Sequence, residues 1–495
     1  MKRDITQFVS LKVKRFTKAG IIGLILLIAL SSIALWAQKS PKDKFIYPPL
    51  NPIQVPPIEQ VKLSNGLRVF LVEDHEFPTI EMRALVRTGS VFEPENKLGL
   101  AAITGEVLRT GGTKNLSGDE IDQILEQIAA SIETSIGQTS GYIYVSLMKD
   151  DLEKVLSLLA DILMNPAFRE DKIQLAKIKQ KSYIARRNDD VGQITQREFA
   201  KLIYGAKSPY ARHPEYATID SITREDILNF YQKYFSPDNM LLAVVGDFQV
   251  PRMKAKLEKT LGQWPAKKVK VPSFPPVKYN YVYRVNLIEK PDVNQSNIML
   301  GHIGGLMNNP DYPALIIMNS ILSLERMFKK IRTDEGLAYS VWGRYGAGYA
   351  VPGIFSCGAQ TKSESTVYAI KLMLQELKRI TQEEVTDEEL RRAKDQYLNG
   401  FVFNFDSKTK ILSRILTYAY FGYPLDFMER LKKQVERVTK KDVLRVARKY
   451  LRPEQVQILV VGNPQNFDQS LEVLGPVTKI DITIPPPPKK AGQGK

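Results

Sequence analysis

Residues 223–246 read TREDILNFYQKYFSPDNMLLAVVG, and residues 439–462 read TKKDVLRVARKYLRPEQVQILVVG. The two segments align without a gap. Each predicts a threonine-capped helix, a proline that ends the helix, and an apolar strand that ends in glycine. Self-similarity within a chain is the signature of a duplicated structural unit. The sequence therefore predicts two related halves.

Sequence patterns N-terminal to residues 223–246 predict the strands and helices of the first half. Asn65-Gly66 lies between two apolar runs, which is a strong hairpin signal. Ser117 and Glu120 have the spacing of a capping box ahead of an amphipathic helix. A strand at 141–148 is followed by helices at about 151–163 and 170–187. The predicted fold class is α+β, with two homologous halves that each contain a mixed β-sheet backed by helices.

Composition divides the chain into six segments. They are a signal peptide or membrane anchor (1–37), a proline-rich spacer (38–57), an N-terminal half (58–265), a linker (266–279), a C-terminal half (280–475) and a proline-rich tail (476–495). The end of the tail reads IPPPPKKAGQGK, which offers no core-forming run and predicts disorder.

The N-terminus is basic up to Lys18 and apolar from Ala19 to about Ala37. This order is typical of a secretory signal, with a cleavage context near Ala37. The apolar run is also nearly long enough to span a bilayer, so an uncleaved anchor is the alternative. Both interpretations predict an extracytoplasmic, periplasmic location.

The chain carries 70 Lys+Arg and 54 Asp+Glu, a formal net charge of +16. These basic residues are dispersed and form no cluster interleaved with aromatics, which argues against a nucleic-acid-binding protein. They are expected to be solvated surface, with an acidic partner or anionic membrane as the alternative. The single cysteine, Cys357, excludes an intrachain disulfide and is expected to be a small buried hydrophobic residue.

The stretch GLAAITGEVLRTGGT, residues 99–113, predicts an amphipathic helix that ends at Gly111 and Gly112. Gly105 lies in the middle of this helix, where glycine costs about 1 kcal/mol relative to alanine. We interpret it as the mark of a lost functional side chain.

Four stretches carry a resemblance to a known family. They are LSNGLRVFLVEDHEFP (63–78), the GLA helix that ends in GGT, the duplicated helix-strand unit, and IRTDEGLAYSVW (331–342). Together they resemble the insulinase/pitrilysin family of zinc peptidases, in its smaller form built from two homologous halves. The resemblance implies a clam-like chamber, formed by paired halves or paired subunits, that encloses a peptide.

The catalytic motif of that family is H-x-x-E-H on the GLA helix, where two imidazoles bind zinc and the glutamate acts as base. The resemblance places Ala102 at the first histidine, Gly105 at the glutamate and Glu106 at the second histidine. A more distal glutamate normally completes the zinc shell, but residues 172–188 contain no acidic residue. We therefore expect no metal or cofactor to be bound by this chain, and we expect Glu106 to be a solvated helix residue.

Arg332 and Tyr339 flank a predicted turn at Gly336. In this family such an R…Y pair resembles a substrate clamp that faces the zinc of another half or subunit. The structural alternative is an ion pair of Arg332 with Asp334 or Glu335, together with a Tyr339 in the core. The preceding segment, 321–327, lacks the glycines of the family's glycine-rich loop, so this loop is expected to be altered.

Three functions follow from these patterns. The first is a non-metal subunit of a two-component zinc metallopeptidase, inactive alone, that supplies Arg332 and Tyr339 in trans to a homologous H-x-x-E-H partner bearing the zinc. The second is an inactive pseudo-peptidase that acts as a peptide-binding or scaffold protein. The third is an autonomous peptidase with improvised ligands, which three scattered histidines disfavour. The sequence specifies neither the peptide substrate nor the oligomer stoichiometry.

Overall fold

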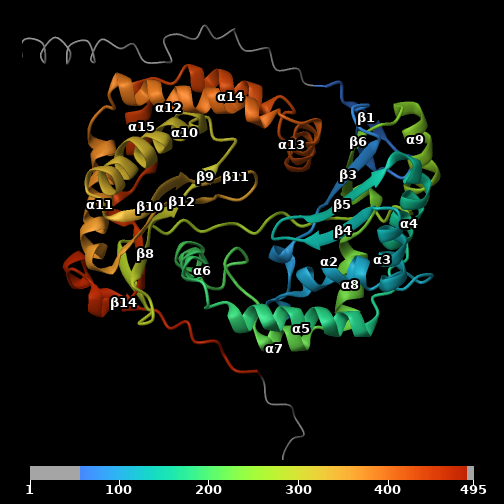
Figure 1. The fold of residues 1–495 in the computed structure, drawn as a ribbon, viewed down its shortest axis with the longest axis horizontal. Coiled ribbons are helices and arrows are strands. Elements are labelled where there is room, and N and C mark those ends of the chain that lie inside the picture. The colour runs from blue at the N-terminus through green and yellow to red at the C-terminus, as the bar shows by residue number, and fades with distance from the viewer. Residues whose placement is uncertain (1–55, 488–495) are drawn as a thin grey trace, which may run out of the picture. The chain divides into compact units, whose positions relative to one another are not determined.

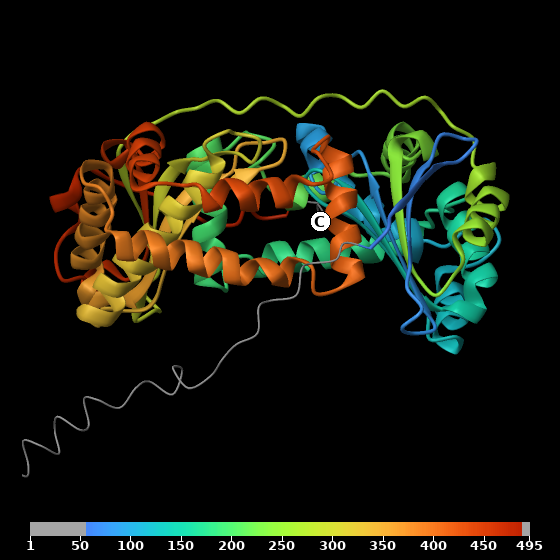
Figure 2. The same ribbon diagram turned by 90° about the horizontal axis from the view of Figure 1, so that it is seen from above.

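The computed structural model describes residues 56–487 (Figure 1). The predicted signal or anchor and most of the spacer lie outside the described residues. No helix within 56–487 combines the length and apolar character needed to cross a membrane. Residues 265–283, which include the predicted linker, form neither helix nor strand, and Figure 2 shows this segment as an extended trace.

The first half contains a six-stranded mixed sheet. Its strands, in spatial order, are β1 (Glu59–Lys62), β2 (Arg68–Glu73), β6 (Met240–Gly246), β3 (Thr79–Val86), β5 (Gly141–Met148) and β4 (Ser131–Ile136). Strands β2 and β6 are parallel, and the other neighbours are antiparallel. The hairpin predicted at Asn65-Gly66 joins β1 to β2, and Gly66 adopts the left-handed conformation with φ of +93°.

The second half repeats this sheet. Its strands, in spatial order, are β10 (Ala338–Tyr345), β12 (Ile354–Lys362), β8 (Gln295–Ile303), β13 (Gln457–Gly462), β7 (Arg284–Glu289) and β14 (Val477–Lys479). Read from the opposite end, the order matches the first sheet, so that β7, β13, β8, β12 and β10 correspond to β2, β6, β3, β5 and β4. A separate parallel pair joins β9 (Gly305–Leu306) to β11 (Ala347–Gly348). The predicted fold class is therefore confirmed.

Helices cover one face of each sheet (Figure 1). Those of the first half are α2 (Leu100–Thr110), α3 (Gly118–Gln127), α4 (Leu152–Met164), α5 (Glu170–Arg186), α7 (Tyr216–Ser221), α8 (Arg224–Tyr234) and α9 (Val250–Lys259). Those of the second half are α10 (Tyr312–Ser320), a π-helical segment (Ile321–Asp334), α11 (Thr366–Gln382), α12 (Asp387–Gly400), α14 (Phe427–Glu436) and α15 (Lys440–Tyr450). Each set encloses its own buried apolar core.

The remaining two helices are exchanged between the halves. Helix α13 (Lys408–Phe421) follows α12, yet its Leu412 and Leu416 pack on the first sheet against residues such as Val245. Helix α6 (Val191–Tyr204) follows α5, yet it packs on the second sheet in a core that includes Val461. The two helices occupy matching places in the repeat. This reciprocal packing covers the second face of both sheets and joins the halves.

The exchange explains why β6 and β13 read as continuous apolar runs. Alternate residues of β6 enter different cores, with Leu242 and Val244 on the side of α2 and Leu241 and Val245 on the side of α13. Strands buried on both faces lose the usual alternation of apolar and polar residues.

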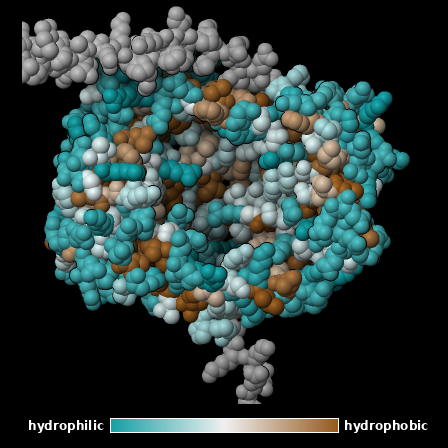
Figure 3. All heavy atoms as spheres, viewed as in Figure 1, coloured by the Kyte–Doolittle hydropathy of each residue, from teal (hydrophilic) through white to brown (hydrophobic). Residues whose placement is uncertain are grey.

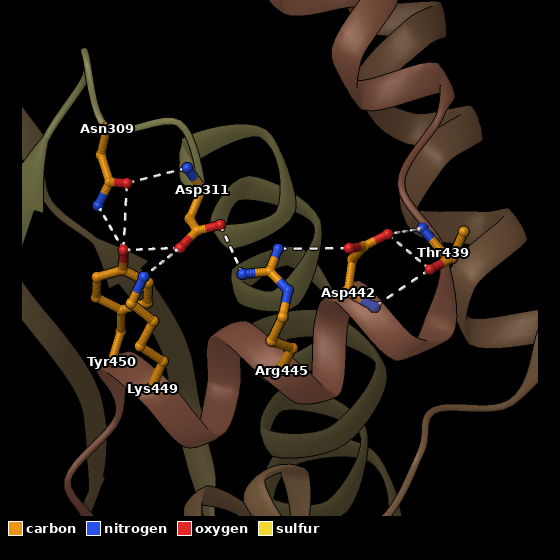
Figure 4. Close-up of polar contacts among 7 residues, drawn as sticks. All are labelled: Asn309, Asp311, Thr439, Asp442, Arg445, Lys449 and Tyr450. Carbon is orange, nitrogen blue, oxygen red and sulfur yellow. Dashed lines mark hydrogen bonds and ion pairs between the residues drawn. The ribbon is translucent and has the colours of Figure 1, made fainter.

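The helices of the duplicated unit begin as predicted. Thr223 with Asp226 and Thr439 with Asp442 form capping boxes at α8 and α15. Figure 4 shows the network that continues from the second box, where Arg445 connects Asp442 to Asp311. Lys449 and Tyr450 also donate to this Asp311 carboxylate. Burial opposes its ionisation, but hydrogen bonds from Lys449, Arg445 and Tyr450 outweigh burial and lower the pKa of Asp311 to about 2.

The predicted tail begins with a strand, ahead of the stretch IPPPPKKAGQGK (484–495) for which disorder is predicted. Strand β14 pairs in parallel with β7 at the edge of the second sheet. Ile480 and Ile482 pack against the core that contains α6, and Ile484 packs against the core of the first half. Apolar residues at alternate positions before the proline run anchor this stretch. On the face shown in Figure 3 hydrophilic residues cover most of the surface, in agreement with solvated charges.

Candidate functional site

Helix α2 carries the positions where the resemblance places the zinc motif. It spans Leu100–Thr110, close to the prediction, and buries Leu100, Ile103 and Val107 along one face. Gly99 precedes it with φ of +100°, and Gly111 follows its last residue. The carboxyl group of Glu93 accepts a hydrogen bond of 2.6 Å from the Ala101 amide and so satisfies a free donor of the first turn.

Gly105 has a structural role that the sequence interpretation missed. A Cβ atom built on this glycine would lie 2.4 Å from the amide nitrogen of Ile136 and 2.7 Å from the carbonyl carbon of Ser135. Thr134 also donates a hydrogen bond of 2.6 Å to the Gly105 carbonyl. Strand β4 therefore touches the backbone of α2 here. Our interpretation of Gly105 only as the mark of a lost side chain is wrong, because close packing requires glycine.

Glu106 faces helix α5 and not open solvent. Its Oε1 lies 3.1 Å from Lys179 Nζ, and its side chain is 25% exposed. The hydrogen bond to Glu106 raises the pKa of Lys179, so the ammonium stays charged. The expectation that Glu106 is merely a solvated residue is corrected. No local pattern in the sequence indicates this pairing, because Glu106 and Lys179 are far apart in the chain.

The residues around α2 do not fit a zinc ion. Ala102 and Gly105 offer no ligand atom, and Glu106 is paired with an ammonium group. Across residues 56–487 there is no group of three or more His, Cys, Asp or Glu side chains that could hold a metal ion. His75 lies instead 2.6 Å from Asp247, whereas His302 is buried and bonded to the Ile303 carbonyl.

The structure brings Arg332 and Tyr339 together. The guanidinium carbon of Arg332 lies 5.6 Å from the centroid of the Tyr339 ring and 5.1 Å from that of Phe328. Gly336, with φ of +64°, forms the turn that returns the chain from the π-helical segment to β10. Phe328 was not singled out by the sequence, although its place four residues before Arg332 on a helix could have indicated it.

The structural alternatives for this pair are not observed. Glu335 pairs with Lys330 at 2.8 Å, and no ion pair joins Arg332 to Asp334 or Glu335. Tyr339 is 75% exposed and so lies outside the core. Two exposed hydrogen-bond donors, a guanidinium and a phenol, are thus held side by side on the surface of the second half.

The segment before this pair is a helix. Residues 321–327 belong to the π-helical segment, and Arg326 there is buried against Glu389, with Nε 3.0 Å from Oε1. The glycine-free sequence keeps a helical apolar face, so a helix stands where the family's glycine-rich loop was expected to be altered. Cys357 is fully buried, as predicted, and burial raises the pKa of its thiol.

Comparison with known families agrees with this architecture. The family description "Insulinase (Peptidase family M16)" matches residues 68–201, and "Peptidase M16 inactive domain" matches residues 221–397. The molecule is a two-half peptidase-fold protein, and the chain belongs to the M16, or insulinase, family.

Individual relatives cover most of the chain. A protein of Helicobacter pylori named non-peptidase homolog YmxG is 22% identical over 80% of this chain and 91% of its own length. The mitochondrial-processing peptidase subunit beta of Saccharomyces cerevisiae is 22% identical over 83% of this chain and 92% of its own. The crystal structure of a peptidase M16 inactive domain from Pseudomonas fluorescens superposes with a TM-score of 0.73, at 22% identity, over 82% of this chain and 98% of that one.

Proposed function

We propose that this chain is the non-metal subunit of a two-component zinc metallopeptidase. A homologous partner would carry H-x-x-E-H and the zinc, and this chain would supply Arg332 and Tyr339 to the peptide carbonyl. The observation that carries the proposal is the exposed Arg332–Tyr339 pair, which has no structural task in the core. One of the similar proteins is itself named as a subunit of a processing peptidase.

The chemistry of the pair suits this role. A guanidinium and a phenol can both donate to a carbonyl oxygen, and such donors stabilise the negative charge that develops when water attacks. The Arg332 guanidinium lies over the rings of Phe328 and Tyr339. These contacts restrict its side chain and so reduce the conformational entropy that it loses on binding a peptide. The zinc of the partner would supply the attacking hydroxide.

A second candidate is a pseudo-peptidase that binds peptides or partners without chemistry. The packing of Gly105 against β4 favours it, because a side chain that acts as a general base could not be accommodated at this position. A similar protein is named a non-peptidase homolog. An autonomous peptidase finds no support in the residues around α2.

We also propose an extracytoplasmic, periplasmic location. The basic N-terminus and the apolar run up to about Ala37 support it, whether the segment is cleaved or retained as an anchor. N-terminal sequencing of the mature protein separates the two cases.

Purification of the chain alone and together with an H-x-x-E-H homologue tests the proposed function. We expect no cleavage of a peptide library by this chain alone, and cleavage by the pair. If the partner cleaves at the same rate with and without this chain, the scaffold function is favoured. Stoichiometric zinc and cleavage by this chain alone would establish an autonomous peptidase.

A further inference from the structure

The Arg332–Tyr339 pair lies at the end of an unusual helix. Residues Ile321–Asp334 form a π-helix of 14 residues that continues α10 without a break. The π pattern holds to its end, where the Glu335 amide donates to the Lys330 carbonyl, five residues earlier, at 3.1 Å. Helices of the π form are rare, mostly limited to a single turn, and frequent at functional sites. A π-helix of this length therefore needs contacts that hold it in this form.

The form of this helix decides where Arg332 lies. Hydrogen bonds span five residues in a π-helix and four in an α-helix, so the α form has fewer residues per turn. If the stretch before Arg332 changed to the α form, each residue would turn further about the helix axis. The Arg332 guanidinium would then leave its place 5.6 Å from the centroid of the Tyr339 ring. The geometry of the pair therefore depends on the π form.

Arg326 anchors this π-helix to α12. Its side chain is 2% exposed, with Nε 3.0 Å from Oε1 of Glu389 and Nη2 3.4 Å from Oε2. Burial opposes the ionisation of Glu389, but the hydrogen bond from Arg326 helps to hold the pKa of this carboxyl below its usual value. Glu383 is farther away, 3.9 Å from Nη2, and is itself bonded to Arg379. A two-point pair with Glu389 fixes the orientation of the guanidinium as well as its distance.

A second contact fixes the start of the π-helix. The Gly343 amide of β10 donates a hydrogen bond of 2.8 Å to Ser323 Oγ. Arg326 follows three residues after Ser323, and Arg332 follows six residues after Arg326. Both anchors thus precede Arg332 on one continuous helix. They determine the rotation with which the chain reaches the turn at Gly336.

We propose that Arg326 is a positioning residue of the clamp, whose ion pair with Glu389 holds the π-helix in the register that places Arg332 over Tyr339. This inference deepens the proposed function and rests on it, because it gives Arg332 and Tyr339 the same task. Arg326 is too deeply buried to touch the peptide and acts through Arg332.

Turnover by the chain reconstituted with its H-x-x-E-H partner tests the role of Arg326. The test variant combines Arg326→Met with Glu389→Gln. It removes both charges together, so that no unpaired charge is left buried. Glutamine also suits the capping box that Glu389 forms with Thr386. The variant should therefore fold, with a urea midpoint close to that of the unsubstituted chain.

The expected effect falls on kcat. A misplacement of about 1 Å can cost about 10²-fold in rate, so kcat should fall by about 10- to 100-fold. KM should change by less than about twofold, because the donors act on the developing oxyanion. In a chain that already carries Arg332→Ala, the double substitution should lower kcat by less than about twofold further, since Arg326 acts through Arg332.

A matched control and a hydrogen-exchange measurement complete the test. Lys440→Met with Asp387→Asn removes an ion pair of 2.9 Å that joins α12 to α15, and it should leave kcat unchanged. Hydrogen exchange followed by mass spectrometry needs no partner subunit. In the Arg326→Met, Glu389→Gln chain, amides of residues 327–337 should exchange at least about tenfold faster, whereas those of α10 should not change.

Three results would overturn the inference and leave the proposed function standing. The first is a folded double variant with unchanged kcat, although Arg332→Ala lowers kcat. The second is a combined chain in which the losses from Arg332→Ala and from the double substitution multiply. The third is unchanged exchange at residues 327–337. Unchanged kcat in Arg332→Ala alone would instead show that the proposed function is wrong, and the inference would fall with it.

Discussion

Lys179 Nζ lies 3.1 Å from Glu106 Oε1, so an ammonium–carboxylate pair joins α5 to α2 at a position where the family resemblance places a zinc ligand. A positive charge thus lies beside α2 in this chain, and the Lys179 ammonium, not a zinc ion, supplies it. Two features besides the missing histidines oppose zinc binding at this place. They are the ammonium of Lys179 and the contact of β4 with Gly105.

The pair predicts how a zinc site could be rebuilt. Ala102→His with Glu106→His places two imidazoles one turn apart but should not retain zinc, because the Lys179 ammonium would repel the metal. Addition of Lys179→Glu replaces that charge with a carboxylate ligand and should yield about one zinc per chain after dialysis, as measured by elemental analysis. Lys181→Glu is the control, since Lys181 pairs with Asp220 and not with Glu106. Retention of zinc by the double variant would contradict this account.

Replacing Gly105 by alanine should lower the free energy of unfolding, whereas the same replacement at an ordinary helical glycine raises it. Gly105→Ala should destabilise the protein by about 2 kcal/mol or more, because the new Cβ meets the β4 backbone. Gly400→Ala, in open space on α12, should stabilise it by about 0.5–1 kcal/mol. Urea unfolding measures both variants. A Gly105→Ala protein as stable as the Gly400→Ala protein would show that β4 does not touch α2.

The cap of α2 predicts a pH dependence. Burial raises the pKa of Glu93 from its usual 4.5 to about 7, against the hydrogen bonds from Ala101 and Gly99. The native state therefore holds this proton more tightly than the unfolded state. Protonated Glu93 therefore contributes to the free energy of unfolding in full below pH 4.5. This contribution is lost as pH rises through about 7.

Glu93→Gln isolates this contribution from other titrating groups. Between pH 4.5 and 8 the unsubstituted protein should lose about 3 kcal/mol relative to the variant, because one pKa unit corresponds to about 1.4 kcal/mol. Urea titrations at several pH values give the difference. Parallel stability curves for the two proteins would rule out a raised pKa at Glu93.

The exchanged helices predict that the two halves unfold together. Leu416→Ala removes a buried side chain of α13 from the first sheet and should cost about 2–5 kcal/mol. Unfolding should still show one transition, because α6 and α13 tie each half to the other. Leu175→Ala, at an exposed leucine, should cost less than about 0.5 kcal/mol. Two separate transitions in the Leu416→Ala protein would contradict the coupling.

The sequence predicted most of the fold because its signals are local. The capping boxes at Thr223 and Thr439 and the Asn65-Gly66 hairpin depend on a few adjacent residues. The duplicated unit then predicted the second half from the first. The exchange of α6 and α13 was not predictable, since an amphipathic helix does not specify which sheet it covers.

The candidate site was predictable only in part. Arg332 and Tyr339 follow from a motif, and the structure places them together. The Glu106–Lys179 pair and the contact at Gly105 join segments that are far apart in the chain, and no single-sequence pattern records such distances.

The clamp is the central claim, and its residues are exposed enough to be tested cleanly. Arg332→Ala and Tyr339→Phe should each change the free energy of unfolding by less than about 1 kcal/mol. Arg391→Ala is the control, an exposed arginine on α12 whose ion pairs lie within its own helix.

The most direct measurement is the turnover of a peptide substrate by the chain reconstituted with its H-x-x-E-H partner. The account predicts that Tyr339→Phe and Arg332→Ala each lower kcat by about 10²–10³-fold, the effect of removing one donor to a developing oxyanion. The same variants should leave zinc content and assembly unchanged, and Arg391→Ala should turn over like the unsubstituted pair. Unchanged kcat in both clamp variants would contradict the account.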